Sequence, residues 1–171
     1  MTTAAETTVA EPGPAVTDLE EIARFLYREA RLADEHDYDA WEQLWTDDAK
    51  YWVPTSDSLL APETQMSVIY DNRRRIGTRL QQLRTGKRYA QAPPSNLRRV
   101  VSNIEILDTE GTDTVVGANF MLFESKPRGI EIWAGRTTYR LRRVAGEVKL
   151  AAKTVVLVNN AEAIPTLGFL I

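Results

Sequence analysis

The chain has 171 residues, a formal net charge of −3, 43% hydrophobic residues and 26% charged residues. This mixture is typical of one globular domain and excludes a disordered or fibrous protein. The sequence has no Cys and a single His, His36. These counts exclude disulfides, thiolate nucleophiles, Cys-ligated iron–sulfur clusters and His-rich iron or zinc sites within one chain. If metal or redox chemistry is involved, we expect another polypeptide to carry it.

The composition along the chain predicts location and domain limits. No apolar run approaches the roughly 20 residues that a membrane span needs, and the first residues lack a basic-then-apolar signal sequence. We therefore expect a cytoplasmic protein. Residues 1–16 are rich in Ala, Thr, Glu and Pro, which predicts a disordered tail, and residues 17–171 are expected to form a single domain.

Two helices are predicted at the start of this domain. Apolar side chains recur at helical spacing from Ile22 to Ala33, and again from Tyr38 to Trp45. Thr17 with Glu20 forms a capping-box pattern before the first helix, and Asp37 can cap the second.

A short strand pair and a third helix are predicted next. The run Ala49–Val53 is rich in β-forming residues and is followed by Pro54, and Met66–Tyr70 predicts a second strand. Residues Ser56–Pro62 between them read as a loop. Apolar residues at helical spacing from Ile76 to Leu83 then predict a helix that ends near Gly86, a natural left-handed cap.

The second half of the chain predicts a meander of four long strands. They are expected at 97–107, around 116–123, at 130–144 and at 148–158, and Gly135 can mark a bulge in the third. Together with the helices this is an α+β layout, in which a curved, mostly antiparallel sheet wraps around helices as an open cone. The apolar end, Ile164–Ile171, is expected to be buried against something.

Charge is distributed unevenly. Residues before Tyr51 hold thirteen acidic and four basic side chains, whereas Arg73–Arg99 holds nine basic side chains and no acid. Such asymmetry can indicate a nucleic-acid surface, but complementary charged faces within the fold or towards a protein partner are favoured. The predicted third helix could also bind phosphate or carboxylate ligands, and ion pairing across a subunit boundary is ranked ahead of that.

Each residue of the chain that could take part in catalysis also has a purely structural interpretation. His36 lies among acidic residues and could act in acid–base work, although capping at a helix junction is favoured. A Tyr donor and an Asp base could line a small pocket, as in proton-transfer isomerases, although aromatics at strand spacing are more often core. These pocket candidates are His36, Tyr51, Trp52, Tyr70 and Asp71.

Several motifs taken together resemble one family, the small (beta) subunit of aromatic-ring-hydroxylating dioxygenases, which are Rieske non-haem iron oxygenases. The resemblance spans nearly the whole chain after residue 16. It is carried by 25–31 (FLYREAR), Asp34-Glu35 leading to Tyr38 and Trp41, Asp47-Asp48 before 51–54 (YWVP), 80–86 (LQQLRTG), 93–95 (PPS), 101–103 (VSN) and 134–136 (AGR) before Leu141-Arg142.

The resemblance implies a cone-shaped, cystatin-like fold of the nuclear transport factor 2 (NTF2-like) class, shared with scytalone dehydratase and ketosteroid isomerase. It implies an oxidoreductase complex of α3β3 composition that dihydroxylates an aromatic compound with O2 and reducing equivalents from NAD(P)H. The large (alpha) subunit would carry a Rieske [2Fe-2S] cluster and mononuclear Fe(II). This chain would bind no cofactor, would have no catalytic residue, and would support the assembly.

On this interpretation, some residues are expected at contacts with the large subunit or with other small subunits. Neither nucleic acid nor a membrane is expected as a partner. The candidates are Arg73, Arg79, Arg84, Arg98, Arg99, Phe169, Leu170 and Ile171. Two alternatives stay open: a stand-alone, cofactor-free isomerase, dehydratase or cyclase that uses the pocket candidates above, and a ligand-binding or dimerisation module.

Overall fold

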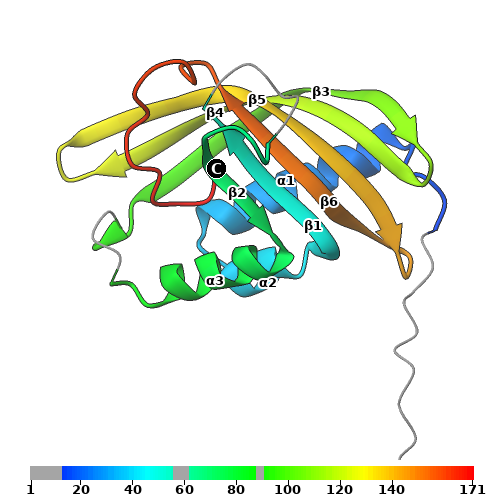
Figure 1. The fold of residues 1–171 in the computed structure, drawn as a ribbon, viewed down its shortest axis with the longest axis horizontal. Helices are drawn as coiled ribbons and strands as arrows, with labels where there is room; N and C mark the ends of the chain where they lie inside the picture. Colours follow the sequence, from blue (N-terminus) through cyan, green and yellow to red (C-terminus); the bar gives the residue numbers. More distant parts are fainter. Residues whose placement is uncertain (1–12, 56–61, 88–90) are drawn as a thin grey trace, which may run out of the picture.

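The structure is a computed structural model that describes residues 13–55, 62–87 and 91–171 (Figure 1). The helices and strands of these residues follow the chain as α1 (Leu19–Asp34), α2 (Tyr38–Glu42), β1 (Trp45–Pro54), β2 (Ser67–Asn72), α3 (Arg73–Arg84), β3 (Asn96–Glu110), β4 (Asp113–Lys126), β5 (Gly129–Val144) and β6 (Glu147–Leu157). Residues 1–12 of the predicted tail 1–16 and most of the predicted loop Ser56–Pro62 lie outside the described residues.

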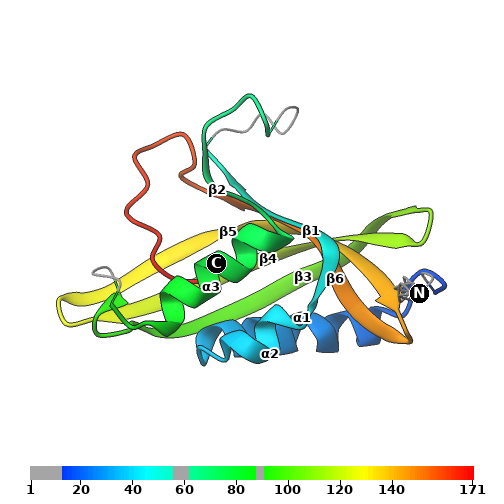
Figure 2. The same cartoon turned by 60° about the horizontal axis from the view of Figure 1, so that its bottom comes forward.

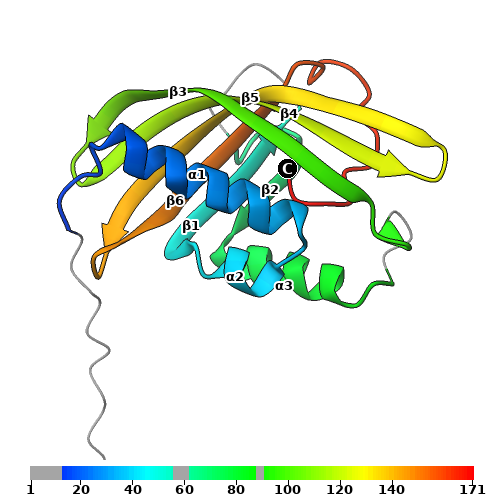
Figure 3. The same cartoon turned by 180° about the vertical axis from the view of Figure 1, so that it is seen from behind.

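The described strands form one curved sheet in the order β2-β1-β6-β5-β4-β3. All neighbours pair antiparallel except β1 and β6, which run parallel. The helices lie on one side of this sheet, as Figures 2 and 3 show. The predicted architecture, a mostly antiparallel sheet curved around helices, is confirmed. None of the helices in the described residues is long and apolar enough to cross a membrane.

Helix α1 begins one residue later than the capping pattern predicted. The carboxylate of Asp18, rather than the Thr17 hydroxyl, accepts the exposed backbone N–H of Glu20, and the Glu20 side chain pairs with Arg24. An Asp at this position also favours the positive end of the helix dipole. The helix buries the apolar stripe expected from the sequence, including Ile22 and Leu26, both 0% exposed.

Helix α2 is shorter than the spacing predicted, because Trp45 belongs to β1. The backbone there pairs with β6, where the N–H of Leu150 donates to the carbonyl oxygen of Leu44 at 2.7 Å. Trp45 still contacts Trp41, with ring centroids 5.1 Å apart. A residue at helical spacing can therefore reach the same core from a strand. The Asp37 cap was predicted correctly, since its carboxylate accepts the N–H of Ala40 at 3.1 Å.

The described residues begin at residue 13, before residue 17 where the predicted domain starts. Gly13 donates its N–H to the carbonyl oxygen of Arg143 at 2.9 Å, and Val16 is 0% exposed. The Val16 carbonyl oxygen accepts the buried hydroxyl of Thr114 at 2.8 Å. Residues 13–16 therefore pack against the end of the sheet and do not belong to a disordered tail.

Gly135 does not mark a bulge. It pairs in regular register with Phe120 on β4 and with Leu157 on β6. A Cβ atom at Gly135 would collide with the carbonyl oxygen of Val156 and lie 2.9 Å from the ring of Phe120. Close approach of a neighbouring backbone, rather than a bend, is therefore what requires glycine here.

Strand β3 reverses the usual relation between apolar residues and the core. Leu97 and the side chain of Arg99 face the interior, whereas Val100 is 58% exposed. The interior position of Arg99 is stabilised by Asp34 at the end of α1. The hydrophobic alternation of this strand alone would have placed Val100 inside.

Candidate functional site

The interior of the cone holds a buried ion pair that the sequence analysis missed. The ammonium of Lys153 on β6 donates to Oε1 of Glu29 on α1 at 2.8 Å, and the two side chains are only 2% and 1% exposed. The same carboxylate oxygen accepts the indole N–H of Trp41 at 2.8 Å. Lys153 also lies over the rings of Tyr51 and Tyr139, 5.7 and 5.9 Å from their centroids.

Burial and neighbouring charges shift the pKa values of the ionisable groups in this interior. Burial opposes ionisation of Glu29, but the positive charges of Lys153 and Arg99 outweigh that effect and hold the pKa of Glu29 below its usual range. Burial lowers the pKa of the Lys153 ammonium. Burial also raises the pKa values of the Tyr51 and Tyr139 hydroxyls, which therefore remain protonated.

The C-terminal segment, defined as Leu167–Ile171, fills the remaining interior. It lies on the helix side of the sheet, where its four large apolar side chains are no more than 6% exposed (Figure 1). The hydroxyl of Tyr51 donates to the carbonyl oxygen of Ile171 at 2.6 Å and accepts its N–H at 3.0 Å. The ring of Phe169 meets that of Trp133 edge-on, with centroids 5.4 Å apart.

A second interior ion pair ties this segment to the helices. Arg99 Nε donates to Asp34 Oδ1 at 2.7 Å, and Asp34 Oδ2 accepts the backbone N–H of Arg99 at 2.8 Å. The Arg99 guanidinium also donates to the carbonyl oxygen of Leu170 at 2.8 Å. One side chain therefore joins the end of α1, the start of β3 and the C-terminal segment.

The five predicted pocket residues do not converge on one cavity. Tyr51 points into the interior and is bonded to Ile171, whereas Trp52 donates its indole N–H to Ser67 Oγ at 2.9 Å. The ring of Trp52 contacts that of Tyr70, with centroids 6.3 Å apart. Adjacent residues of a strand face opposite sides of a sheet, so Tyr51 and Trp52 are separated by the sheet itself.

His36 has a structural role at the junction of α1 and α2, where its φ is 59°. Its Nε2 lies 3.0 Å from the carbonyl oxygen of Ser95, and its Nδ1 lies 3.1 Å from the hydroxyl of Tyr38. Because a carbonyl oxygen only accepts, Nε2 carries the proton and Nδ1 accepts the Tyr38 O–H. Nε2 therefore ties the helix junction to the residue before β3, and Nδ1 is used within the junction itself.

The arginines of α3 fall into two groups. Three are paired within the chain: Arg73 with Glu42 at 3.0 Å, Arg84 with the same carboxylate at 2.8 Å, and Arg79 with Asp71 at 2.6 Å. The paired acids come from α2 and β2, outside the basic segment, as the missing acidic neighbours in that segment suggested.

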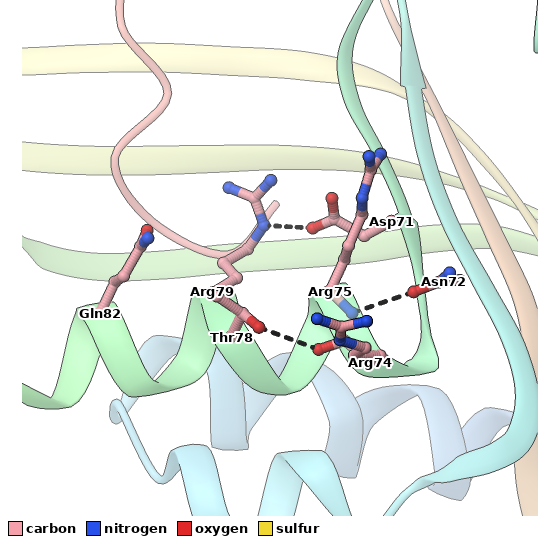
Figure 4. Close-up of a pocket in the computed structure, with 7 residues that line it drawn as sticks. All are labelled: Asp71, Asn72, Arg74, Arg75, Thr78, Arg79 and Gln82. Carbon is pink, nitrogen blue, oxygen red and sulfur yellow. Dashed lines mark hydrogen bonds and ion pairs between the residues drawn. The ribbon is translucent and has the colours of Figure 1, made fainter.

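The other α3 arginines border an open cleft of about 570 Å³ (Figure 4). The Arg75 guanidinium donates to the carbonyl oxygen of Tyr70 at 3.2 Å. Arg74 projects from the first turn of α3 without an acidic partner among the described residues. The lining residues are Asp71, Asn72, Arg74, Arg75, Thr78, Arg79 and Gln82.

The sequence contained a signal for the interior network. Glu29 lies on the apolar stripe of α1, three residues after Leu26 and four after Phe25. Lys153 lies on the same buried face of β6 as Ala151 and Val155. A lone acid on an apolar helix face and a lone base on an apolar strand face indicate mutual burial. Among the described residues, no group of three or more His, Cys, Asp or Glu side chains could hold a metal ion.

Comparisons with known proteins agree on one family. A family profile described as "Ring hydroxylating beta subunit" matches residues 28–162. The small oxygenase component of the p-cumate 2,3-dioxygenase system of Pseudomonas putida is 32% identical over 135 residues, which cover 78% of this chain and 75% of that protein.

Solved structures give the same answer. The beta subunit of benzoate 1,2-dioxygenase from Burkholderia mallei superimposes with a TM-score of 0.73 at 28% identity, covering 85% of this chain and 93% of that one. An NTF2-like protein with a cystatin-like fold from Novosphingobium aromaticivorans has a TM-score of 0.60 at 17% identity, covering 83% and 82% of the two chains, and shows the fold alone. The chain belongs to the ring-hydroxylating beta subunit family, and is a structural subunit of an aromatic-ring dioxygenase.

Proposed function

We propose that this chain is the small subunit of a cytoplasmic hexamer of three large and three small subunits. The large subunit would carry the Rieske [2Fe-2S] cluster and the mononuclear Fe(II), and would oxidise the aromatic ring. The observation that carries the structural role is that the interior of the cone is occupied by the chain's own Glu29–Lys153 pair and C-terminal segment.

This filled interior favours the structural role over a stand-alone isomerase, dehydratase or cyclase. An enzyme of that kind needs a concave pocket and an acid or base that can reach the substrate. Here Glu29 accepts hydrogen bonds from Lys153 and Trp41, and the Tyr51 hydroxyl is bonded twice to Ile171. A substrate would have to displace all of these contacts to reach either group.

A subunit without a reacting group can still affect turnover. Electron transfer between neighbouring large subunits would depend on their relative placement, because catalysis is sensitive to the geometry of the reacting groups. A small subunit that fixes this placement supports the reaction without touching the substrate. Its loss would therefore lower activity by disturbing the assembly.

The proposed contacts with the large subunit centre on the basic side chains that remain at the surface. Arg98 is exposed, and Arg73 and Arg84 are partly exposed, with side-chain exposures of 30% and 34%. Arg79, Arg99 and Phe169–Ile171 are covered by this chain's own residues, so they would support the contact surface from within. Arg74 and Arg75 in the α3 cleft extend the surface towards an acidic partner.

The names of the two dioxygenase relatives described above support an aromatic carboxylic acid as the substrate class of the complex. Both p-cumate and benzoate are aromatic carboxylates, and they are the substrates named for the two dioxygenase relatives above. The carboxylate would be recognised mainly by the large subunit, where the ring must lie against the iron.

Co-expression with the large-subunit gene tests this function. We expect the two chains to purify together with the mass of the hexamer, and the complex to convert benzoate-type acids faster than phthalate-type or polycyclic compounds. The small subunit alone should convert none of them. Turnover by the isolated small subunit, or purification of an active large subunit that never binds it, would contradict the proposal.

A matched pair of charge reversals tests the basic surface. Arg74→Glu with Arg75→Glu should weaken co-purification with the large subunit, and increasingly so at low salt, because repulsion replaces attraction. Arg28→Glu with Arg128→Glu changes the same number of exposed charges elsewhere and serves as the control. Equal recovery of the hexamer from both double variants would remove the α3 cleft from the contact surface.

A further inference from the structure

The C-terminal segment is held in the interior by side chains, as a bound ligand would be. Residues 158–171 contain no helix or strand, so no sheet ladder fixes the segment in place. Its backbone groups are instead bound by the Tyr51 hydroxyl and by the Arg99 guanidinium. These two side chains come from β1 and β3, which lie far from the segment in sequence. The segment therefore occupies a site that the rest of the chain has built.

Two neighbouring groups of the segment together have the chemistry of an aromatic carboxylic acid. The Phe169 ring meets the Trp133 ring edge-on, an arrangement that is favourable for any benzene ring. The next carbonyl oxygen, that of Leu170, accepts the Arg99 guanidinium at 2.8 Å. A guanidinium binds a carboxylate more strongly than a neutral carbonyl, because charge assists the hydrogen bond. The site would therefore prefer a free acid to the backbone carbonyl that is bound to Arg99.

Withdrawal of the segment would leave two buried donors without their partners. The Arg99 side chain is 3% exposed, and Tyr51 is 0% exposed. Arg99 would keep Asp34 through its Nε but would lose the Leu170 carbonyl oxygen from its Nη2. The Tyr51 hydroxyl would lose both hydrogen bonds to Ile171. An unpaired buried donor costs free energy that a ligand oxygen would recover, and polar groups beside an aromatic wall are usual in small-molecule pockets.

The buried ion pair would take no part in binding. Glu29 is bonded to Lys153 and to the Trp41 indole, and these bonds do not involve the segment. A ligand in place of the segment would therefore leave the pair intact and gain no acid or base from it. The site is suited to holding a ligand rather than converting it, in keeping with a structural subunit.

An open cleft of about 610 Å³ lies where the chain enters the interior. Its lining includes Pro165 and Thr166, directly before the C-terminal segment, and the exposed Arg128. Residues 161–166 are exposed or half-buried and loop away from the sheet (Figure 1), so most of this connection lies outside the core. An acid can therefore reach the interior by the route along which the segment leaves.

We propose that the interior of the cone is a binding site for an aromatic carboxylic acid, which the C-terminal segment occupies when no acid is bound. The ring of the acid takes the place of Phe169 against Trp133. Its carboxylate takes the place of the Leu170 carbonyl oxygen on Arg99, and the charge-assisted bond supplies the preference that shifts the equilibrium. The ligand class follows from these contacts, so the inference does not depend on the assembly or on its substrate.

The segment competes with the acid as a tethered ligand. A group on a short flexible connection has an effective concentration of roughly millimolar. A free acid has to overcome that competition before it replaces the segment in the wild-type chain. Weakening the segment, rather than the site, should therefore reveal the affinity of the interior.

Phe169→Ala in the full chain tests the site, because it removes the ring and keeps the backbone groups of the segment. Isothermal titration calorimetry with phenylpropionate should give a dissociation constant at least about tenfold below that of the wild type. Leu167→Ala is the matched control, since it also removes a buried apolar side chain from the segment but keeps the Phe169 ring. It should bind the acid as weakly as the wild type.

Two further measurements separate a site for an acid from a simple apolar cavity. Phenylpropanol has the same ring without the carboxylate, and should bind Phe169→Ala at least about tenfold more weakly than the acid does. In the wild type, saturating phenylpropionate should shift the amide NMR signals of Leu170 and Ile171, because the segment leaves the interior. This second measurement needs no variant, and circular dichroism shows whether Phe169→Ala and Leu167→Ala are folded.

A folded Phe169→Ala chain that binds phenylpropionate no more tightly than the wild type would overturn the inference. Equal affinity for the acid and the alcohol would also overturn it, since that result would show an apolar cavity only. Unchanged Leu170 and Ile171 signals at saturating acid would contradict displacement of the segment. A wild-type chain that binds the acid but never a large subunit would count against the proposed function alone.

Discussion

The two faces of the sheet differ in a way that opposes the usual arrangement of a soluble domain. The inner face buries the Glu29–Lys153 and Asp34–Arg99 ion pairs, and the outer face exposes large apolar side chains. A buried ion pair adds little net stability, although removing one of its partners is strongly destabilising. Exposed apolar side chains lower the free energy only when another surface covers them. The inner face therefore gives a defined shape to one subunit, whereas the outer face leaves large apolar side chains exposed.

The largest expected effect comes from breaking the interior pair. Lys153→Met should lower the free energy of unfolding by about 4 kcal/mol, because Glu29 would be left buried without its cation. The double variant Glu29→Met with Lys153→Met should recover most of that loss, since no charge remains to be desolvated. Urea unfolding of the three proteins measures both effects. A single variant as stable as the wild type would show that water reaches Glu29.

Neighbouring residues on β4 sharpen the comparison between the two faces. Leu122→Ala should cost about 3 kcal/mol, because it leaves a cavity in the inner core, where Leu122 is 0% exposed. Met121→Ala, one residue earlier and on the outer face, should change the stability of the monomer by less than about 0.5 kcal/mol. Denaturation at low protein concentration separates these values from any effect of self-association. Equal losses at both positions would mean that the outer face is also part of the monomer core.

The interior pair also predicts how stability depends on pH. The pKa of Glu29 is lowered in the folded state, so its stabilising effect is present above its unfolded pKa of about 4.5 and is lost as pH falls through the folded pKa. The wild type should therefore lose stability on acidification faster than the Glu29→Met, Lys153→Met double variant, by up to about 1.4 kcal/mol per pH unit for one proton. Parallel pH profiles of the two proteins would show that Glu29 binds its proton equally in both states.

The smallest effect is expected at the surface pairs that join α2 to α3. Hydrogen bonds from Arg84 and Arg73 lower the pKa of Glu42, although all three side chains are partly exposed to solvent. Glu42→Gln should therefore cost no more than about 1 kcal/mol, and less in high salt, because water and ions screen the interaction. Thermal unfolding at two salt concentrations measures it. A loss as large as that of Lys153→Met would mean that this surface cluster, rather than the interior, holds the helices in place.

Much of the fold was predictable from local patterns. The apolar stripe of α1, the Asp37 cap, the left-handed Gly86 and the four long strands follow from spacing and backbone preferences that act within a few residues. The motifs that resembled the ring-hydroxylating beta subunit family were confirmed by the family profile and by related structures. The cap of α1 was misplaced by one residue because Thr17 and Asp18 are both good caps, and only the geometry selects between them.

Composition and periodicity by themselves determined the α+β class and the helical stripes, and the order of residues in several motifs resembled the family of this chain, because these properties depend on local propensity and on residue order. Tertiary structure alone decided that Arg99 faces inward and Val100 outward, that Glu29 meets Lys153 across 124 positions of sequence, and that the C-terminal segment closes the cone. The physical reason is that burying a charge is tolerable only when its partner arrives at the same place, and a partner so distant in the chain is supplied by the fold.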